Sequence, residues 1–191
     1  MADRLPPIPA EAMTPAQRVA AAEIVAGARG ALYGPFVPLL RSPELMSRLQ
    51  KTGEYLRYGS AVPERLKEFV ILLVARHHDQ QVEWAIHQPI ALAAGLAPGI
   101  VDAVAEGRRP GEMADDEAVI HDFVIELRLT KGVSDPTYGR ALVLLGEQGV
   151  VDLVAIVGYY TVLALVMNVA RTPVPPSKLP SSLPVMPLRT S

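Results

Sequence analysis

The sequence predicts an all-α protein in one compact domain, a bundle of about seven or eight helices. Half of the 191 residues are hydrophobic but only 5% are aromatic, so Ala, Val, Leu and Ile must build the core. Such a core suits closely packed helices. Helix-starting motifs recur along the chain, whereas no stretch combines strand-like alternation with paired turns. The length corresponds to a single domain.

Two helices are expected near the N-terminus, each opened by a proline motif. Thr14-Pro15-Ala16-Gln17 forms a capping box with proline at the first helical position, and this helix should run to about Gly30. The stretch 31–42 contains Gly-Pro and a second proline, which predict a loop. Ser42-Pro43 then caps a helix that should run through about Tyr58.

The two central helices carry the most apolar and the most informative sequence. One starts at Pro63, and its uninterrupted apolar run Phe69–Ala75 predicts a helix at the centre of the fold. Asp79 is the expected cap of the next helix, which should end at Gly95. Pro89 lies inside that helix and is expected to kink or break it.

The C-terminal part is expected to contain further helices over about 98–106 and 116–131. Asp135-Pro136 starts another helix, the glycines at 146–149 interrupt it, and a long apolar helix follows over 150–170. These elements make residues 1–172 one helical domain. The tail, 173–191, holds six of the 18 prolines and is expected to be non-helical. It is either disordered or a strap, for which Val185, Met186 and Leu188 offer apolar contacts.

The apolar segment 150–170 is almost long enough to cross a bilayer, which requires roughly 20 apolar residues. Asp152, Asn168 and the central pair Tyr159 and Tyr160 argue against lipid on all sides. We interpret the segment as a core helix that is buried partly by another subunit. The proline-rich N-terminus lacks the apolar run of a secretory signal, which predicts a cytoplasmic protein.

Composition excludes several classes of function. The net charge of −2 provides no positive field for a polyanion, so nucleic acid is not an expected partner. The chain has no cysteine, which rules out disulfides, thiolate metal ligands and thiol nucleophiles.

Polar side chains embedded in the central helices are the candidate catalytic residues. Glu68 stands immediately before the apolar run of its helix. Glu83 and His87 are four residues apart, so they lie on one helix face, and Gln80 extends that stripe. A carboxylate beside an imidazole fixes its tautomer and prepares it for proton transfer near neutral pH. The same spacing also occurs in ordinary surface pairs, so the pattern alone leaves both interpretations open.

A metal site is the alternative interpretation of this region. His77, His78 and Asp79 precede Glu83 and His87, and together they supply nitrogen and oxygen ligands. Adjacent histidines point to different sides of a helix, however, and the cluster lacks a recurrent metal spacing. We therefore expect no metal and no other cofactor. His121 is interpreted as an interface residue of an amphipathic helix.

The stretch ERLKEFVILLVARHHDQQVEWAIHQPIALAAGL, together with LVAIVGYYTVLALVMNVA, resembles the carboxymuconolactone decarboxylase family over about residues 30–172. The resemblance implies an orthogonal helical bundle like that of the related alkylhydroperoxidase D proteins. In those proteins a glutamate precedes a Cys-x-x-Cys motif and a histidine follows it. By spacing, the glutamate corresponds to Glu68 and the histidine to His87, while Gln80 and Glu83 replace the two cysteines. Thiol peroxidase activity is therefore excluded.

The resemblance implies a cofactor-free lyase or isomerase that acts on a small carboxylated or lactone substrate. In this hypothesis His87 donates the proton, Glu83 orients it and Glu68 supports the pocket. The substrate carboxylate needs a cation, for which Arg76, Arg57 and Arg48 are candidates. Further candidates for the pocket lining are Gln80, Trp84, Tyr55, Tyr159 and Tyr160.

Two rival functions stay open at this stage. One is a non-catalytic scaffold that binds a ligand or assembles with other chains, and the other is a metal-dependent enzyme using His77, His87 and Glu83. In every case we expect a homo-oligomer, since the apolar runs exceed what one small bundle can bury. The resemblance implies a trimer or a hexamer, and a dimer stays possible.

Overall fold

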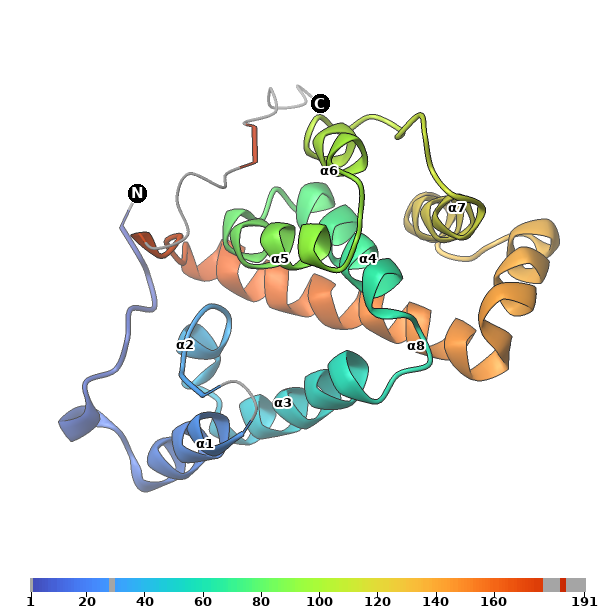
Figure 1. The fold of residues 1–191 in the computed structure, drawn as a ribbon. Coiled ribbons are helices and arrows are strands. Elements are labelled where there is room, and N and C mark those ends of the chain that lie inside the picture. The colour runs from blue at the N-terminus through green and yellow to red at the C-terminus, as the bar shows by residue number, and fades with distance from the viewer. Residues whose placement is uncertain (1, 28–29, 177–182, 185–191) are drawn as a thin grey trace.

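A computed structural model describes residues 2–27, 30–176 and 183–184 of the chain. The described residues form helices and no strand, which confirms the all-α prediction (Figure 1). A single 3-10 turn, Ala10–Ala12, precedes the α-helices. The helices are α1 Pro15–Ala26, α2 Phe36–Leu39, α3 Pro43–Tyr58, α4 Glu64–His77, α5 Gln81–Ala93, α6 Pro98–Ala105, α7 Asp115–Thr130 and α8 Asp135–Ala170.

Helix α4 lies at the centre of the fold, as its apolar run predicts. Every residue from Leu66 to Arg76 is buried, and α4 packs against α5, α6, α7 and α8. In Figure 1, α8 runs across the molecule with α4, α5 and α6 on one side and α2 and α3 on the other. The polar residues in the middle of α4 are therefore enclosed by other helices.

Most of the predicted helix starts are confirmed, and the differences concern loops and caps. The Thr14 capping box is present, with both of its hydrogen bonds to Gln17. The predicted loop over 31–42 contains the short helix α2, which buries Phe36 and Leu39. The loop prediction holds for 31–35 and 40–42 and was wrong for 36–39, where buried apolar side chains stabilise a single helical turn.

The start and the course of α5 also differ from the sequence prediction. Gln80, not Asp79, caps α5, and its side-chain oxygen accepts a hydrogen bond from the Val82 amide at 2.6 Å. Asp79 instead adopts a left-handed backbone conformation with φ of 50°. Pro89 does not break the helix, which continues to Ala93. A proline removes one backbone hydrogen bond, and the packing of α5 against α4 tolerates that loss.

Helix α8 bends at Gly146, whose φ of 69° and ψ of 175° are not helical. The predicted interruption is therefore present as a bend between two helical halves. Asp135–Ala170 is long and apolar enough to cross a membrane, but half of its most apolar 18-residue window is buried inside the protein. The other half of that window faces outward, so within one chain this helix is not enclosed on nearly every side.

Two described residues of the tail contact the helical body. Leu183 is buried, and its backbone N–H and C=O form hydrogen bonds with the side chain of Gln81 at 2.9 and 3.1 Å. Arg76 donates to the Pro184 carbonyl at 2.8 Å. The apolar residues predicted for a strap, Val185, Met186 and Leu188, lie outside the described residues.

Candidate active site

Glu68, Glu83 and His87 come together in the interior of the fold. Glu68 lies on α4, and the other two lie one turn apart on α5. The short connection 78–80 turns the chain back, so that α5 packs along α4 and presents its Glu83–His87 face to Glu68. The exposed fractions are 0% for Glu68 and 3% for both Glu83 and His87.

His87 lies between the two carboxylates. Its Nδ1 is 2.7 Å from Glu68 Oε2, a hydrogen-bond distance, and its Nε2 is 3.4 Å from Glu83 Oε2. A neutral imidazole has one N–H donor and one acceptor nitrogen, whereas a carboxylate only accepts. Both contacts are favourable only if the imidazole carries two protons or one carboxyl group is protonated. A group that exchanges a proton must lie within hydrogen-bond reach of its partner, and His87 meets this condition toward Glu68.

Arg57 and Tyr160 complete the cluster from two further helices. The Arg57 guanidinium on α3 is 3.7 Å from Glu68 Oε1. Tyr160 on α8 lies edge-on to the His87 ring, with 5.3 Å between ring centroids. Four helices thus contribute to one polar site inside an apolar core.

The surroundings keep both of these side chains protonated. Burial raises the pKa of the Tyr160 hydroxyl, and the nearby Glu83 and Glu68 raise it further, although Arg57 opposes them. Burial alone would lower the pKa of Arg57, but Tyr160 and Glu68 outweigh that effect and raise it. The site therefore contains one permanent cation and one phenolic O–H donor.

Arg57 is the most exposed side chain of the cluster, at 16%. Its guanidinium also lies 5.9 Å from the ring centroid of Tyr58, which is an exposed residue. A solute that approaches from water therefore meets the cation first. Two hollows at the surface of the described residues lie elsewhere: one of about 640 Å³ is between α7 and the first half of α8, and one of about 450 Å³ is between α1 and α3.

Gln80 and Arg76, which were predicted to bind substrate, form hydrogen bonds with other parts of the protein. Gln80 caps α5 and donates from Nε2 to Asn168 Oδ1 on α8 at 2.8 Å. Arg76 donates to Asp79 at 2.5 Å and to the backbone carbonyls of Ala105 and Pro184. Arg76 thus fastens α6 and the tail segment to the end of α4.

Two other aromatic candidates, Trp84 and Tyr55, have contacts that serve the core and a neighbouring polar group. Trp84 is 2% exposed and belongs to the hydrophobic core. The Tyr55 hydroxyl lies 3.0 Å from Asp152 Oδ1 and accepts a hydrogen bond from Gln148. Asp152 also accepts from the Ala61 amide at 2.8 Å, so this buried carboxylate ties α8 to the α3–α4 loop.

The histidines proposed for a metal site are separated from His87. The rings of His77 and His78 contact each other at the end of α4, with 4.6 Å between centroids. Among the described residues, no group of three or more His, Asp or Glu side chains is arranged to hold a metal ion.

Sequence reasoning placed Arg57 among three arginines and Tyr160 among several possible lining residues, without choosing either. Arg48 is exposed and pairs with Glu44 one helical turn away, whereas Arg57 contacts Glu68. The choice of Arg57 depends on how α3 packs against α4, and no local motif reports that.

Comparison with known proteins adds no relative of established function. No protein-family model matches the chain, and no curated protein is significantly similar to it in sequence.

Proposed function

We propose that this protein is a cofactor-free lyase or isomerase that transfers a proton to or from a small carboxylated or lactone substrate at His87. The observation that supports it best is the position of the imidazole, with one ring nitrogen 2.7 Å from Glu68 and the other 3.4 Å from Glu83. A core that needed only stability would place apolar side chains there, because buried charges are costly unless they are paired.

The closer carboxylate, Glu68, is the group that orients the ring in this proposal. With Nδ1–H directed at Glu68, the Nε2 position faces Glu83 and can exchange a proton with it or with a substrate. Glu83 lies in the first turn of α5, where the helix dipole favours a negative charge. Arg57 balances the charge of Glu68 and attracts an anionic substrate.

A decarboxylation at this site needs one proton. The bond between the substrate carbon and its carboxylate breaks, CO₂ leaves, and the electron pair remains as a conjugated enolate. His87 then forms the new C–H bond by donating its proton to the enolate carbon. An isomerisation uses the same groups, with a proton removed from one carbon and returned to another.

The resemblance to the carboxymuconolactone decarboxylase family supports this proposal, and we infer that the chain is a cysteine-less relative of that family. In this chain Gln80 caps α5, and Glu83 reaches His87 from the first turn. The two positions that correspond to the redox cysteines thus have a structural role and a proton-transfer role. Glu68 and His87, which correspond by spacing to the glutamate and the histidine of the related proteins, are in contact in this chain.

A non-catalytic scaffold is the second candidate function. The deep burial of Glu68, Glu83 and His87 favours it, since a substrate must displace side chains to reach them. The two candidates differ in what they predict for proton exchange with an added ligand.

The test uses purified protein with carboxymuconolactone and a panel of small lactone carboxylates in D₂O. Loss of CO₂ and deuterium incorporation at carbon are followed by NMR. We expect turnover by the wild type and a loss of about 10²–10⁴-fold in His87→Ala and Glu68→Gln. His121→Ala is the matched control, because His121 is another buried histidine, which lies on α7 and contacts Phe69 and Arg109.

The outcomes separate the candidates clearly. Equal rates in the His87→Ala variant and the wild type would remove His87 from the mechanism. Absence of exchange with every ligand of the panel, in protein that binds one of them, would favour the scaffold. Activity that is lost after chelation and restored by a divalent metal would favour the metalloenzyme instead.

A further inference from the structure

The second half of α8 exposes a continuous apolar stripe. We call it the α8 face and define it as Val151, Val154, Gly158, Val162 and Leu165. The four large side chains are between 41% and 68% exposed, although other residues of the same half-helix, such as Leu153, Ile156 and Leu163, are buried. Val169 continues the stripe at 65% exposure. The 15 residues from 151 to 165 are separated by 14 rises of about 1.5 Å, so the stripe is about 21 Å long.

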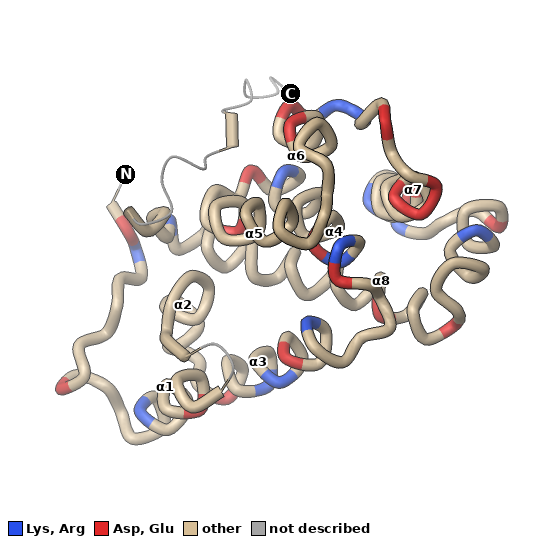
Figure 2. The backbone as a smooth tube through the Cα atoms, in the orientation of Figure 1, with Lys and Arg blue, Asp and Glu red and all other residues tan. Residues whose placement is uncertain are grey.

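The face carries no charge. Asp152 points to the other side of α8, where it is buried against Tyr55, and the next charged residue in the sequence is Arg171. Figure 2 shows the middle of α8 without Lys, Arg, Asp or Glu. An apolar helix face that is exposed to water is usually bordered by charged residues. This stripe lacks such a border.

The spacing of the face is symmetric about Gly158. Val154 and Val162 are each four residues from Gly158, and Val151 and Leu165 are each seven residues from it. An antiparallel copy of the same helix, related by a two-fold axis at Gly158, therefore places Val151 opposite Leu165 and Val154 opposite Val162. A two-fold interface requires this reciprocity, in which residue i meets residue j and j meets i.

Gly158 itself permits the close approach. No heavy atom lies within 4 Å of the place that a Cβ atom would occupy there, so this glycine is not needed for packing within the chain. At the crossing point of two helices, the missing side chain lets the backbones come together and the flanking valines interdigitate.

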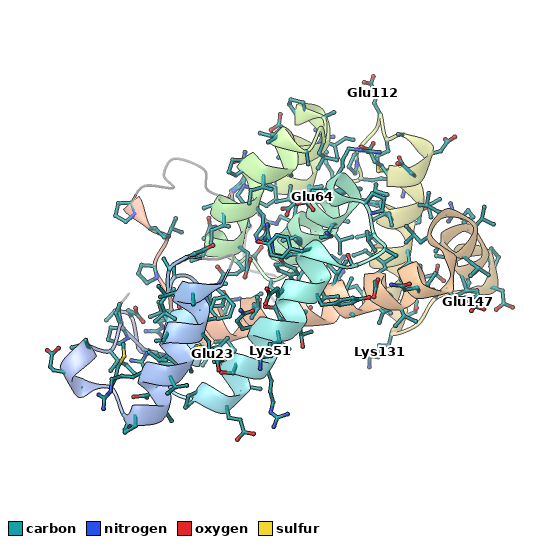
Figure 3. The ribbon with its side chains drawn as sticks, turned by 60° about the horizontal axis from the view of Figure 1, so that its bottom comes forward. Glu23, Lys51, Glu64, Glu112, Lys131 and Glu147 are labelled. Carbon is teal, nitrogen blue, oxygen red and sulfur yellow. The ribbon has the colours of Figure 1, made fainter. Side chains whose placement is uncertain are left out.

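We propose that the α8 face is the interface with a second copy of this chain, in an antiparallel pair with Gly158 at the two-fold axis. The ends of the helix also suit this arrangement. Glu147, labelled in Figure 3, is exposed at one end, and Arg171 is exposed at the other. Antiparallel pairing in this register places Glu147 of one copy opposite Val169 of the other, two residues before Arg171, whereas a parallel pair would bring like charges together.

A membrane is a poorer occupant of this face. The helix is only half exposed, and one end of its exposed side carries Glu147 rather than basic residues. Interfacial helices that bind lipid are rich in Lys and Arg on their flanks. The self-complementary spacing also has no role against a lipid surface.

The first test measures molecular mass by light scattering at micromolar concentration. We expect two copies of the 20.5 kDa chain, or an even multiple. Val154→Glu and Val162→Lys should each weaken the pairing at least roughly 100-fold, because each buries an unpaired charge twice per dimer. Val143→Glu is the matched control on the same helix, since Val143 is 90% exposed and lies outside the face.

The combined variants test the antiparallel register. V154E/V162K should pair again, because position 154 of one copy faces position 162 of the other and the new charges attract. V154E/V162E should stay monomeric. Circular dichroism of each variant shows that the fold is retained.

A cross-link locates the axis. The chain has no cysteine, so Gly158→Cys introduces a single thiol. A bismaleimide that spans about 8–10 Å, the separation of packed helices, should join two copies. Gly99→Cys on α6 is the control, because Gly99 is also exposed with no heavy atom within 4 Å of its would-be Cβ, and it should not cross-link.

Several results would overturn the proposal. They are a wild-type mass of one or three copies, the same molecular mass for the V154E/V162K and V154E/V162E variants, and equal cross-linking yields at positions 158 and 99. Binding of the monomer to phosphatidylglycerol vesicles through this face would assign it to a membrane instead.

Discussion

The contact between Glu68 and His87 makes a quantitative prediction about stability. The two side chains are 0% and 4% exposed and lie 2.7 Å apart, so neither is screened by water. Two unit charges about 4 Å apart attract each other by about 4 kcal/mol at an effective dielectric constant of about 20. Desolvation of the two groups offsets much of that gain. Removal of one partner leaves the other buried and unpaired, and we expect Glu68→Gln or His87→Gln to cost about 3–5 kcal/mol.

A double-mutant cycle isolates the contact from the rest of the cluster. Urea unfolding of the wild type, both single variants and the double variant should give a coupling free energy of about 1–3 kcal/mol. The corresponding cycle for Glu83 and His87 should give a smaller value, because their closest atoms are 3.4 Å apart. A Glu68–His87 coupling below about 0.5 kcal/mol would refute the reasoning, since independent residues couple no more strongly than that.

Four further perturbations follow from the structure. Gly149→Ala should destabilise the protein by about 1–3 kcal/mol in urea unfolding, because the added Cβ would lie 2.5 Å from the Leu145 Cβ. Gly139→Ala, with no heavy atom within 4 Å, should instead raise stability by about 0.5–1 kcal/mol, and the opposite order would contradict this packing. Leu183→Ala should cost about 2 kcal/mol, whereas no change would mean that the tail is not docked in solution. Burial lowers the pKa of His121 below its ordinary value of 6.5, with a contribution from Arg109 that Asp122 opposes. The unfolded chain therefore binds this proton more readily, so protonation of His121 favours unfolding. The contribution of neutral His121 to the free energy of unfolding is complete above about pH 6.5 and is lost as the pH falls below it. Melting temperatures between pH 7.5 and 5 should show this decrease, and it should be smaller in His121→Gln.

Local sequence signals predicted the helix starts well because those signals act within a few residues. The capping box at Thr14 and the proline at position 43 fix their helix ends without help from distant parts of the chain. Asp79 failed as a cap because its backbone takes a left-handed turn, which places the side chain of the next residue, Gln80, over the first amides of α5. Asp79 instead pairs with Arg76.

The candidate site shows the same division between local and distant information. Four-residue spacing was enough to predict that Glu83 and His87 share a face. The partnership of Glu68 with His87 came from a resemblance, since periodicity cannot tell which residues of two helices meet. The choice of Arg57 over Arg76 required the packing of α3, and the place of Tyr160 required the rotation of α8 about its own axis.

Gly146 divides α8 into two segments that should respond differently to thermal fluctuation. Its φ of 69° and ψ of 175° belong to a region that is essentially restricted to glycine, so the bend is encoded in the chain. The segment before it is attached mainly to α7, through the ion pair of Arg140 with Asp122 and the hydrogen bonds of Ser134 with Glu126. The segment after it contains Tyr160 and is anchored in the core. Amide hydrogens of residues 135–145 should therefore exchange together with those of α7, as one cooperative unit that opens while the polar cluster stays closed.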